Sequence, residues 1–109
     1  VITSGLAQTN ALSGVASAYS DYLPMMVISG DIKTDLIIKR NNEKLRQGGQ
    51  QDVPIVQIAE SITKRVITVI SANEAIKEFD YLWKLALEEP KGSVLLNIPI
   101  DVQQEEVPE

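Results

Sequence analysis

The sequence has no cysteine and no histidine among its 109 residues. The lack of cysteine excludes disulfides and thiolate metal sites, and the lack of histidine removes the commonest general base and metal ligand. No apolar stretch approaches the roughly 20 residues that a membrane-spanning helix needs. The first residues, Val1–Gly5, also lack the charged region and the long apolar run of a signal peptide. These absences predict a cytoplasmic protein with no membrane segment and little self-contained catalytic chemistry.

The charges are dispersed along the chain rather than gathered into a basic face. The formal net charge is −5, and the one local basic cluster consists of Lys39, Arg40, Lys44 and Arg46. Proteins that bind nucleic acid need a coherent basic surface to displace counterions from phosphates, so nucleic acid is not an expected partner. Apolar residues make up 44% of the chain, which predicts a globular protein rather than a disordered one.

The length allows one modest domain, because burial efficiency falls quickly as chains shrink. The chain has no initiating methionine and opens in what reads as a buried strand. We therefore expect a piece of a longer protein, truncated at the N-terminus.

Four short runs rich in valine and isoleucine read as β-strands, because each ends in turn or capping residues. The second and fourth are almost continuously apolar, which is typical of parallel strands covered by helices on both faces. The four runs are Val1–Thr3, Met25–Ser29, Arg65–Val69 and Val94–Ile98.

The strongest helix prediction covers Ala72–Glu88, where apolar residues recur at the spacing of one helical face. Ser71 and Glu74 form a capping box at its start, in which each side chain accepts the other residue's amide hydrogen. We expect Phe79 and Trp83 on this face to be core residues that dock the helix on the sheet.

The other helices are shorter and less certain in extent. One is expected at Asn10–Tyr19, and a weaker one at Asp52–Glu60 with Pro54 in its first turn. Between them, Asp31–Gln51 is polar and reads as a long connection with at most one helical turn around Leu36–Ile38. Connections of that length are usually functional or mobile.

Strands alternating with helices predict an α/β three-layer sandwich with a mainly parallel sheet and right-handed crossovers. The domain is expected to cover residues 1–103. The tail after Pro99 reads as a linker leaving the domain, with residues 104–109 its acidic end that contains Glu105, Glu106 and Glu109.

The most suggestive place for chemistry is the turn Ser4–Asn10 between the first strand and the first helix. In an open α/β sheet such a turn lies at the carboxyl edge, where helix amides and small side chains let a ligand approach the backbone. A capped helix after a buried strand explains the same residues without a ligand, because Thr9 and Asn10 are common capping types.

No carboxylate pair or nucleophile stands out elsewhere. Asp31, Asp35, Asp52 and Glu60 lie in or beside loops without a spacing that implies a shared site, so solvated charges are expected, with Asp52 capping a helix. The serine hydroxyls have no histidine to activate them.

Five segments, taken in order, resemble the pyrimidine-binding domain of thiamine diphosphate enzymes of the acetolactate synthase type. Thr3–Asn10 is similar to that family's Thr-Ser-Gly-Pro-Gly-Ala-Thr-Asn turn, and Ala18–Gly30 to its Ala-Tyr-x-Asp-x-x-Pro-x-x-x-Ile-x-Gly segment. Gln51-Asp52 lies where the family has Gln-Glu. Ile62–Lys64 reproduces Ile-Thr-Lys, and Gly92–Gln103 is similar to the closing strand Gly-Pro-Val-x-x-x-Ile-Pro-x-Asp-Val-Gln.

The resemblance implies a partial pyrimidine-binding domain of the thiamine-diphosphate-binding fold, whose parent acts on 2-oxo acids as a carboligase or decarboxylase. Three residues of the turn depart from the family, since Leu6 replaces proline and Ala7-Gln8 replaces Gly-Ala. The implied cofactor-binding residues are Gly5, Leu6, Ala7 and Asn10, with Asn10 helping to fix the turn, and the implied substrate-side residues are Gln51 and Asp52.

The resemblance also implies that the chemistry is completed elsewhere. The family's catalytic glutamate belongs to a segment upstream of Val1, and the diphosphate with its Mg²⁺ is held by a separate domain of another subunit, so a homo-oligomer is expected. A flavin (FAD) requirement is left open. The isolated chain is expected to be inactive and to self-associate through an exposed apolar patch. The alternatives are a noncatalytic assembly module of the same fold and a small-molecule-binding domain that uses Gly5–Asn10 alone.

Overall fold

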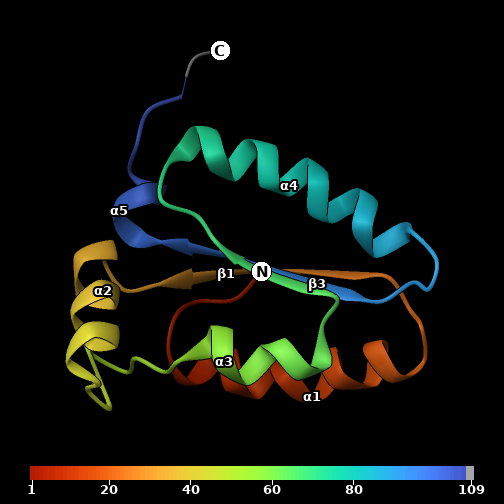
Figure 1. The fold of residues 1–109 in the computed structure, drawn as a ribbon, viewed down its shortest axis with the longest axis horizontal. Helices are drawn as coiled ribbons and strands as arrows, with labels where there is room; N and C mark the ends of the chain where they lie inside the picture. The colour runs from red at the N-terminus through yellow and green to blue at the C-terminus, as the bar shows by residue number, and fades with distance from the viewer. Residues whose placement is uncertain (108–109) are drawn as a thin grey trace.

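The computed structural model describes residues 1–107, and these form three layers around a parallel sheet (Figure 1). The strands are β1 (Met25–Asp31), β2 (Arg65–Thr68) and β3 (Ser93–Pro99). They run in the order β1-β3-β2, and both pairings are parallel. The predicted α/β class with a parallel sheet is therefore confirmed.

The helices cover both faces of the sheet (Figure 1). One face carries α4 (Ala72–Leu87), and the other carries α1 (Leu6–Ser20) and α3 (Ile55–Ala59), which continues into a 3₁₀ turn at Glu60–Ile62. Two further helices stand by the carboxyl ends of the strands, namely α2 (Thr34–Glu43) and α5 (Ile100–Gln103). No helix among the described residues is both long and apolar enough to cross a membrane.

The central strand explains why the core has two halves. Successive side chains of a strand point to opposite faces, so Val94 and Leu96 of β3 pack in the cluster beneath α4, while Leu95 packs with α1 and α3. All three side chains are buried. A strand that is apolar on both faces reads as the continuous run seen in the sequence.

The first predicted strand is reduced to one bridge. Ile2 pairs with Ser29 in parallel, and its amide donates to Ile28 O at 2.9 Å while its carbonyl accepts from Gly30 N at 3.0 Å. The bridge places the start of the chain beside β1 and leads directly into α1.

Helix α4 begins where the sequence predicts and ends one residue earlier, at Leu87, but its packing differs. The Ser71 hydroxyl accepts the Glu74 amide at 3.1 Å as expected, whereas the Glu74 carboxylate accepts from Ile70 N rather than Ser71 N. Phe79 and Trp83 are 40% and 54% exposed, so the prediction that they are core residues is wrong. The helix docks through Leu82 and Ala86 instead.

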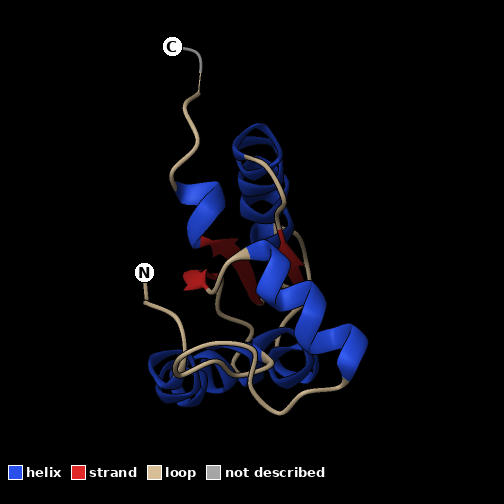
Figure 2. Cartoon of the chain, turned by 90° about the vertical axis from the view of Figure 1, so that its left-hand side faces the viewer, coloured by secondary structure: helices blue, strands red, loops and turns tan. Residues whose placement is uncertain are grey.

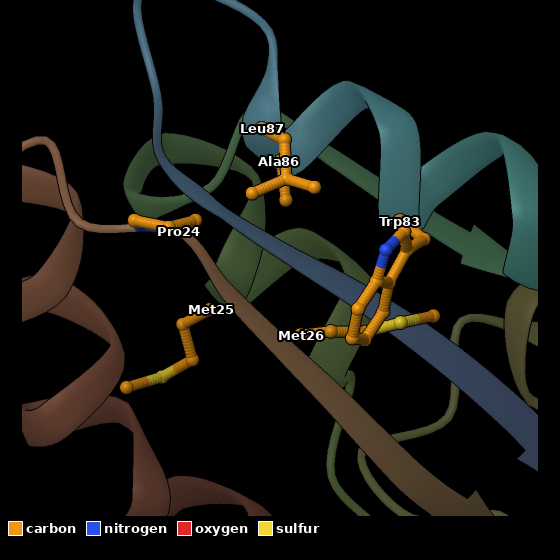
Figure 3. A pocket seen from close by; sticks show the side chains of 6 residues that line it. All are labelled: Pro24, Met25, Met26, Trp83, Ala86 and Leu87. Carbon is orange, nitrogen blue, oxygen red and sulfur yellow. The ribbon is translucent and has the colours of Figure 1, made fainter.

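The exposed aromatic side of α4 borders a shallow apolar groove against β1. Its volume is about 200 Å³, and Figure 3 shows the Trp83 indole turned toward Met26 of the strand. Because β1 is one of the two outer strands, its free edge is paired within the described chain only by the Ile2 bridge. The groove is lined by Pro24, Met25, Met26, Trp83, Ala86 and Leu87.

Two further predictions need correction. The connection Asp31–Gln51 holds the ten-residue helix α2, because Asp101 of α5 accepts hydrogen bonds from Thr34 N and Oγ1 at 3.0 and 3.1 Å and anchors the start of that helix. The tail after Pro99 first forms α5, whose Val102 is buried in the core. Residues 104–107 are exposed and outside any helix or strand, and 108–109 lie outside the described residues.

Candidate functional site

The turn Ser4–Asn10 lies at the carboxyl ends of the strands. This is the side of the molecule that faces the viewer in Figure 2. Helix α1 begins at Leu6 rather than at Asn10, with Gly5 as its N-cap residue. Gly5 has φ 82° and ψ −138°, a conformation that residues with side chains rarely adopt. The predicted capping by Thr9 is wrong, because the Thr9 hydroxyl instead donates to Leu6 O at 2.8 Å within the helix.

The Gln8 side chain holds the turn to the sheet through hydrogen bonds. Its Oε1 accepts the Gly5 amide hydrogen at 3.2 Å, and its Nε2 donates to Gly30 O at 2.7 Å and to Asn97 Oδ1 at 3.3 Å. The side chain is fully buried. The turn is thus attached to the ends of both β1 and β3 through one residue.

Gln51 packs directly against the Gly5 turn. A Cβ placed on Gly5 would lie 2.1 Å from Gln51 O and 2.7 Å from Gln51 Cβ, so the two backbones are in direct contact. Gln51 itself has φ 58°, a left-handed conformation that is uncommon outside glycine. Two residues that are 46 positions apart in the chain therefore meet with unusual backbone geometry on both sides.

A buried ion pair holds the segment that carries Gln51. The Arg40 Nη1 of α2 donates to Asp52 Oδ1 at 2.6 Å, and the other carboxylate oxygen accepts from Gly48 N at 2.9 Å. The side chains of Arg40 and Asp52 are 6% and 0% exposed. The prediction of a solvated or helix-capping Asp52 is therefore wrong, because α2 brings a guanidinium to it.

Asp31 at the end of β1 is also buried, contrary to its prediction as a loop charge, whereas Asp35 and Glu60 are exposed as predicted. Burial raises the pKa of Asp31 above its usual value, against the opposing effect of hydrogen bonds from Asn97 and from the Ile32 amide. The nearby charge of Asp52 raises the pKa further, and Arg40 lowers it.

A groove of about 470 Å³ opens beside the turn at the same edge of the sheet. Its volume falls within the roughly 300–1,000 Å³ that is usual for small-molecule sites. Among the described residues, no group of three or more carboxylates is placed to hold a metal ion. The groove is lined by Val1, Ile2, Thr3, Ile28, Ser29, Gly30, Ile98 and Gln103.

The structure brings most of the predicted site residues together. Gly5, Leu6 and Ala7 form the turn, and Gln51 packs against it, with Asp52 buried directly behind. Leu6 is 59% exposed, so its side chain is free to meet a ligand. Asn10 lies further along α1 and is exposed, and it takes no part in the hydrogen bonds of the turn among residues 1–107.

Sequence reasoning missed the residues that hold the turn in place. These are Gln8, which was noted only as a departure from the family's alanine, together with Asp31, Arg40 and Asn97. A signal was available for Gln8 alone, because a long amide in a turn of small residues needs a buried partner.

Comparison with known proteins agrees with this arrangement of segments. The sequence matches no family model. It aligns over 105 residues, 96% of its length, with the chloroplastic acetolactate synthase of Arabidopsis thaliana at 30% identity. This chain is similar to a segment of acetolactate synthases. Chloroplastic acetolactate synthase 1 of Oryza sativa subsp. japonica is 32% identical and that of Zea mays 31%, again over 105 residues.

The chain spans only 14 to 15% of the length of these relatives. The predicted likeness to acetolactate synthases is thus confirmed at the level of homology to one segment. The relatives are named as chloroplastic proteins, and the predicted cytoplasmic location stays a prediction.

Proposed function

We propose that this chain supplies the pyrimidine side of a thiamine diphosphate site in an enzyme of the acetolactate synthase type. The observation that carries the proposal is the contact between the Gly5 turn and Gln51 at the carboxyl edge of a parallel sheet, within a segment homologous to acetolactate synthases. Open α/β sheets bind ligands at this edge. The noncatalytic alternative gains no support from the comparisons, because the relatives are enzymes by name.

The residues of the turn suit contact with one face of an aromatic ring. The Leu6 side chain is exposed, and the amides of Leu6 and Ala7 have no hydrogen-bond partner among residues 1–107, as first-turn amides usually do not. Gln51 is also exposed beside them and offers an amide to a polar ligand. An apolar contact flanked by a few directed polar groups is the usual composition of a cofactor site.

The rest of the proposed site comes from outside these residues. When bound, thiamine diphosphate supplies the carbanion-stabilising chemistry by which a 2-oxo acid is decarboxylated or joined to a second molecule. In this proposal the chain orients the pyrimidine through the turn and places Gln51 toward the substrate side, while the buried Asp52 holds the Gln51 segment through Arg40 and faces no substrate. The Mg²⁺ and the diphosphate belong to a second domain, contributed by another subunit of a homo-oligomer.

A binding measurement on the full-length protein tests the role of the turn. Leu6→Ala removes apolar surface that would be covered by the cofactor, and the loss of about 1.4 kcal/mol corresponds to a roughly tenfold rise in the dissociation constant for thiamine diphosphate. Calorimetric titration with the cofactor and Mg²⁺ measures it without relying on turnover.

Leu23→Ala is the matched control. Leu23 is 54% exposed, close to the value for Leu6, but it follows the opposite end of α1. We expect it to leave cofactor affinity unchanged. Equal affinities for the Leu6 and Leu23 variants would remove the turn from the cofactor site.

A further inference from the structure

A fully buried asparagine joins the strand ends beneath the candidate site. The Asn97 Nδ2 of β3 donates to Asp31 Oδ2 at 2.5 Å and to Thr68 Oγ1 at 3.2 Å. Its Oδ1 accepts from Ser29 Oγ at 2.8 Å and from Gln8 Nε2 at 3.3 Å. All three strands and α1 therefore meet at one side-chain amide.

The charge of Asp31 and the backbone carbonyl of Gly30 together give this network one direction. An ionised carboxylate can only accept hydrogen bonds, so Asn97 must turn its NH₂ group toward Asp31 and its oxygen toward Gln8. Gln8 donates with Nε2 both to this oxygen and to Gly30 O, and it keeps Oε1 for the amide of Gly5. The reverse orientation of Asn97 would oppose two acceptors at Asp31 and two donors at Gln8.

The network is complete in the observed orientation. Within residues 1–107, no buried side-chain nitrogen or oxygen lacks a hydrogen-bond partner. Buried networks of this kind are strong when every member is satisfied, and they are costly when one member is not. A change at Asp31 is thus transmitted to the neighbouring amides rather than absorbed by water.

We propose that Asp31 is a positioning residue, whose carboxylate holds Asn97 and thereby supports the hydrogen bond from the Gly5 amide to Gln8. The role matters for cofactor binding only if the turn serves the function proposed above. The link itself consists of hydrogen bonds within this chain, and it is measurable without any cofactor.

The charged groups that face Asp31 are Arg40 of α2 and Asp52 of the segment behind Gln51. Burial and Asp52 raise the pKa of Asp31, while Arg40 lowers it, with a net rise. Asp31 therefore takes up a proton at a higher pH than an ordinary exposed aspartate. Over that range the hydrogen bond from Asn97 to Asp31 loses its charge assistance, so Asn97 is held less tightly and supports Gln8 less firmly.

Nuclear magnetic resonance of the protein labelled with ¹⁵N-glycine and ¹³C-aspartate tests the link, because the chain has only six glycine amides to assign. As the pH is lowered, the Gly5 amide shift should follow the Asp31 carboxyl shift with the same midpoint. The Gly14 amide, on the exposed side of α1, should show no such transition. A Gly5 signal that stays constant while Asp31 titrates would overturn the proposal, and this measurement needs no variant.

Substitution gives a second reading at neutral pH. Asp31→Asn should increase hydrogen exchange at the Gly5 amide about tenfold, the effect of losing one hydrogen bond of about 1.4 kcal/mol. Asp35→Asn, on the exposed start of α2, should leave it unchanged. Equal exchange in the two variants would refute the role of Asp31. Loss of the Leu6 effect on cofactor affinity would instead refute the proposed function and leave this link intact.

Discussion

Replacing Gly5 with alanine tests the central contact of the candidate site. The new Cβ would lie 2.1 Å from Gln51 O and 3.0 Å from Gln51 C. Both are backbone atoms, so no flexible side chain can swing aside to make room. Either the turn or the segment 48–52 must move, and that segment is held by the buried pair of Arg40 and Asp52.

Two effects add to the cost of Gly5→Ala. Placing a residue with a side chain at φ 82° and ψ −138° costs about 1–3 kcal/mol in backbone strain. Forcing an extra carbon into a packed contact costs about 1–3 kcal/mol more. The sum, roughly 2–6 kcal/mol, is a large share of the 5–15 kcal/mol that ordinarily separates folded and unfolded states. A fall in melting temperature of roughly 10 °C or more is expected for a domain of this size.

Urea denaturation followed by circular dichroism measures the change, with Gly14→Ala as the matched control. Gly14 lies in the middle of α1, and a Cβ there would meet nothing within 4 Å. Alanine should therefore stabilise the protein by about 0.4–1 kcal/mol through its better helix propensity and the smaller entropy of its unfolded chain. If Gly5→Ala cost less than about 0.5 kcal/mol, the close approach of Gln51 would not exist in the folded protein.

Three other perturbations have definite expected outcomes. Asp52→Asn leaves the buried Arg40 without its counter-charge and should cost about 3–5 kcal/mol in urea denaturation, whereas Asp80→Asn in the exposed pair with Lys84 should cost less than about 0.5 kcal/mol; equal losses would contradict the buried pair. Asp101→Ala removes the hydrogen bonds at the start of α2 and should cost about 1 kcal/mol. Burial acts to raise the pKa of Asp101, but the hydrogen bonds outweigh it and the net pKa is lowered. The stability that Asp101 contributes is therefore present above its pKa in the unfolded chain and is lost as the pH falls through its pKa in the folded protein. A stability difference between Asp101→Ala and the wild type that persists in acid would be inconsistent with this. Trp83→Gln should reduce self-association in sedimentation velocity, because Trp83 is 54% exposed on the apolar groove against β1; a wild-type chain that stays monomeric at high concentration would rule out that surface as an interface.

The elements that the sequence predicted well are those fixed by local pattern. Helix α4 has a regular apolar spacing and a serine cap, and β3 has an almost continuous apolar run, so their positions could be predicted within a residue or two. The side of α4 that packs was not legible. Phe79 and Trp83 belong to an apolar stripe wider than the part of the sheet beneath them, because β1 is the last described strand on that side.

Helix α2 was missed because its causes lie elsewhere in the chain. Its sequence is polar, and its start is fixed by Asp101, which is 67 residues from Thr34. Its one buried residue, Arg40, is a charge that local reasoning assigns to solvent. Such a helix can be predicted only when the residues that it contacts elsewhere in the fold are known.

The same limit applies to the supports of the candidate turn. Asp31 accepts a hydrogen bond from Asn97, 66 residues away, and Asp52 accepts one from Arg40, 12 residues away. Neither pairing arises within a single helix or strand, so no local pattern predicts it. The resemblance could place Gly5 and Gln51 in one site, because it compares whole segments in order. It could not show what holds them there.

The two supports act on one contact from opposite sides, and this has an energetic consequence. Asp31 acts through Gln8 on Gly5, and Asp52 with Arg40 acts on Gln51. When one side of the Gly5–Gln51 contact is no longer held, the contact itself weakens. Removing the hold on the other side then costs less stability than it would in the wild type. The double variant Asp31→Asn/Asp52→Asn should therefore lose less unfolding free energy than the two single variants lose in total. For independent sites the two totals agree within about 0.5 kcal/mol. Strict additivity would mean that the turn and the Gln51 segment are held separately and meet only by proximity.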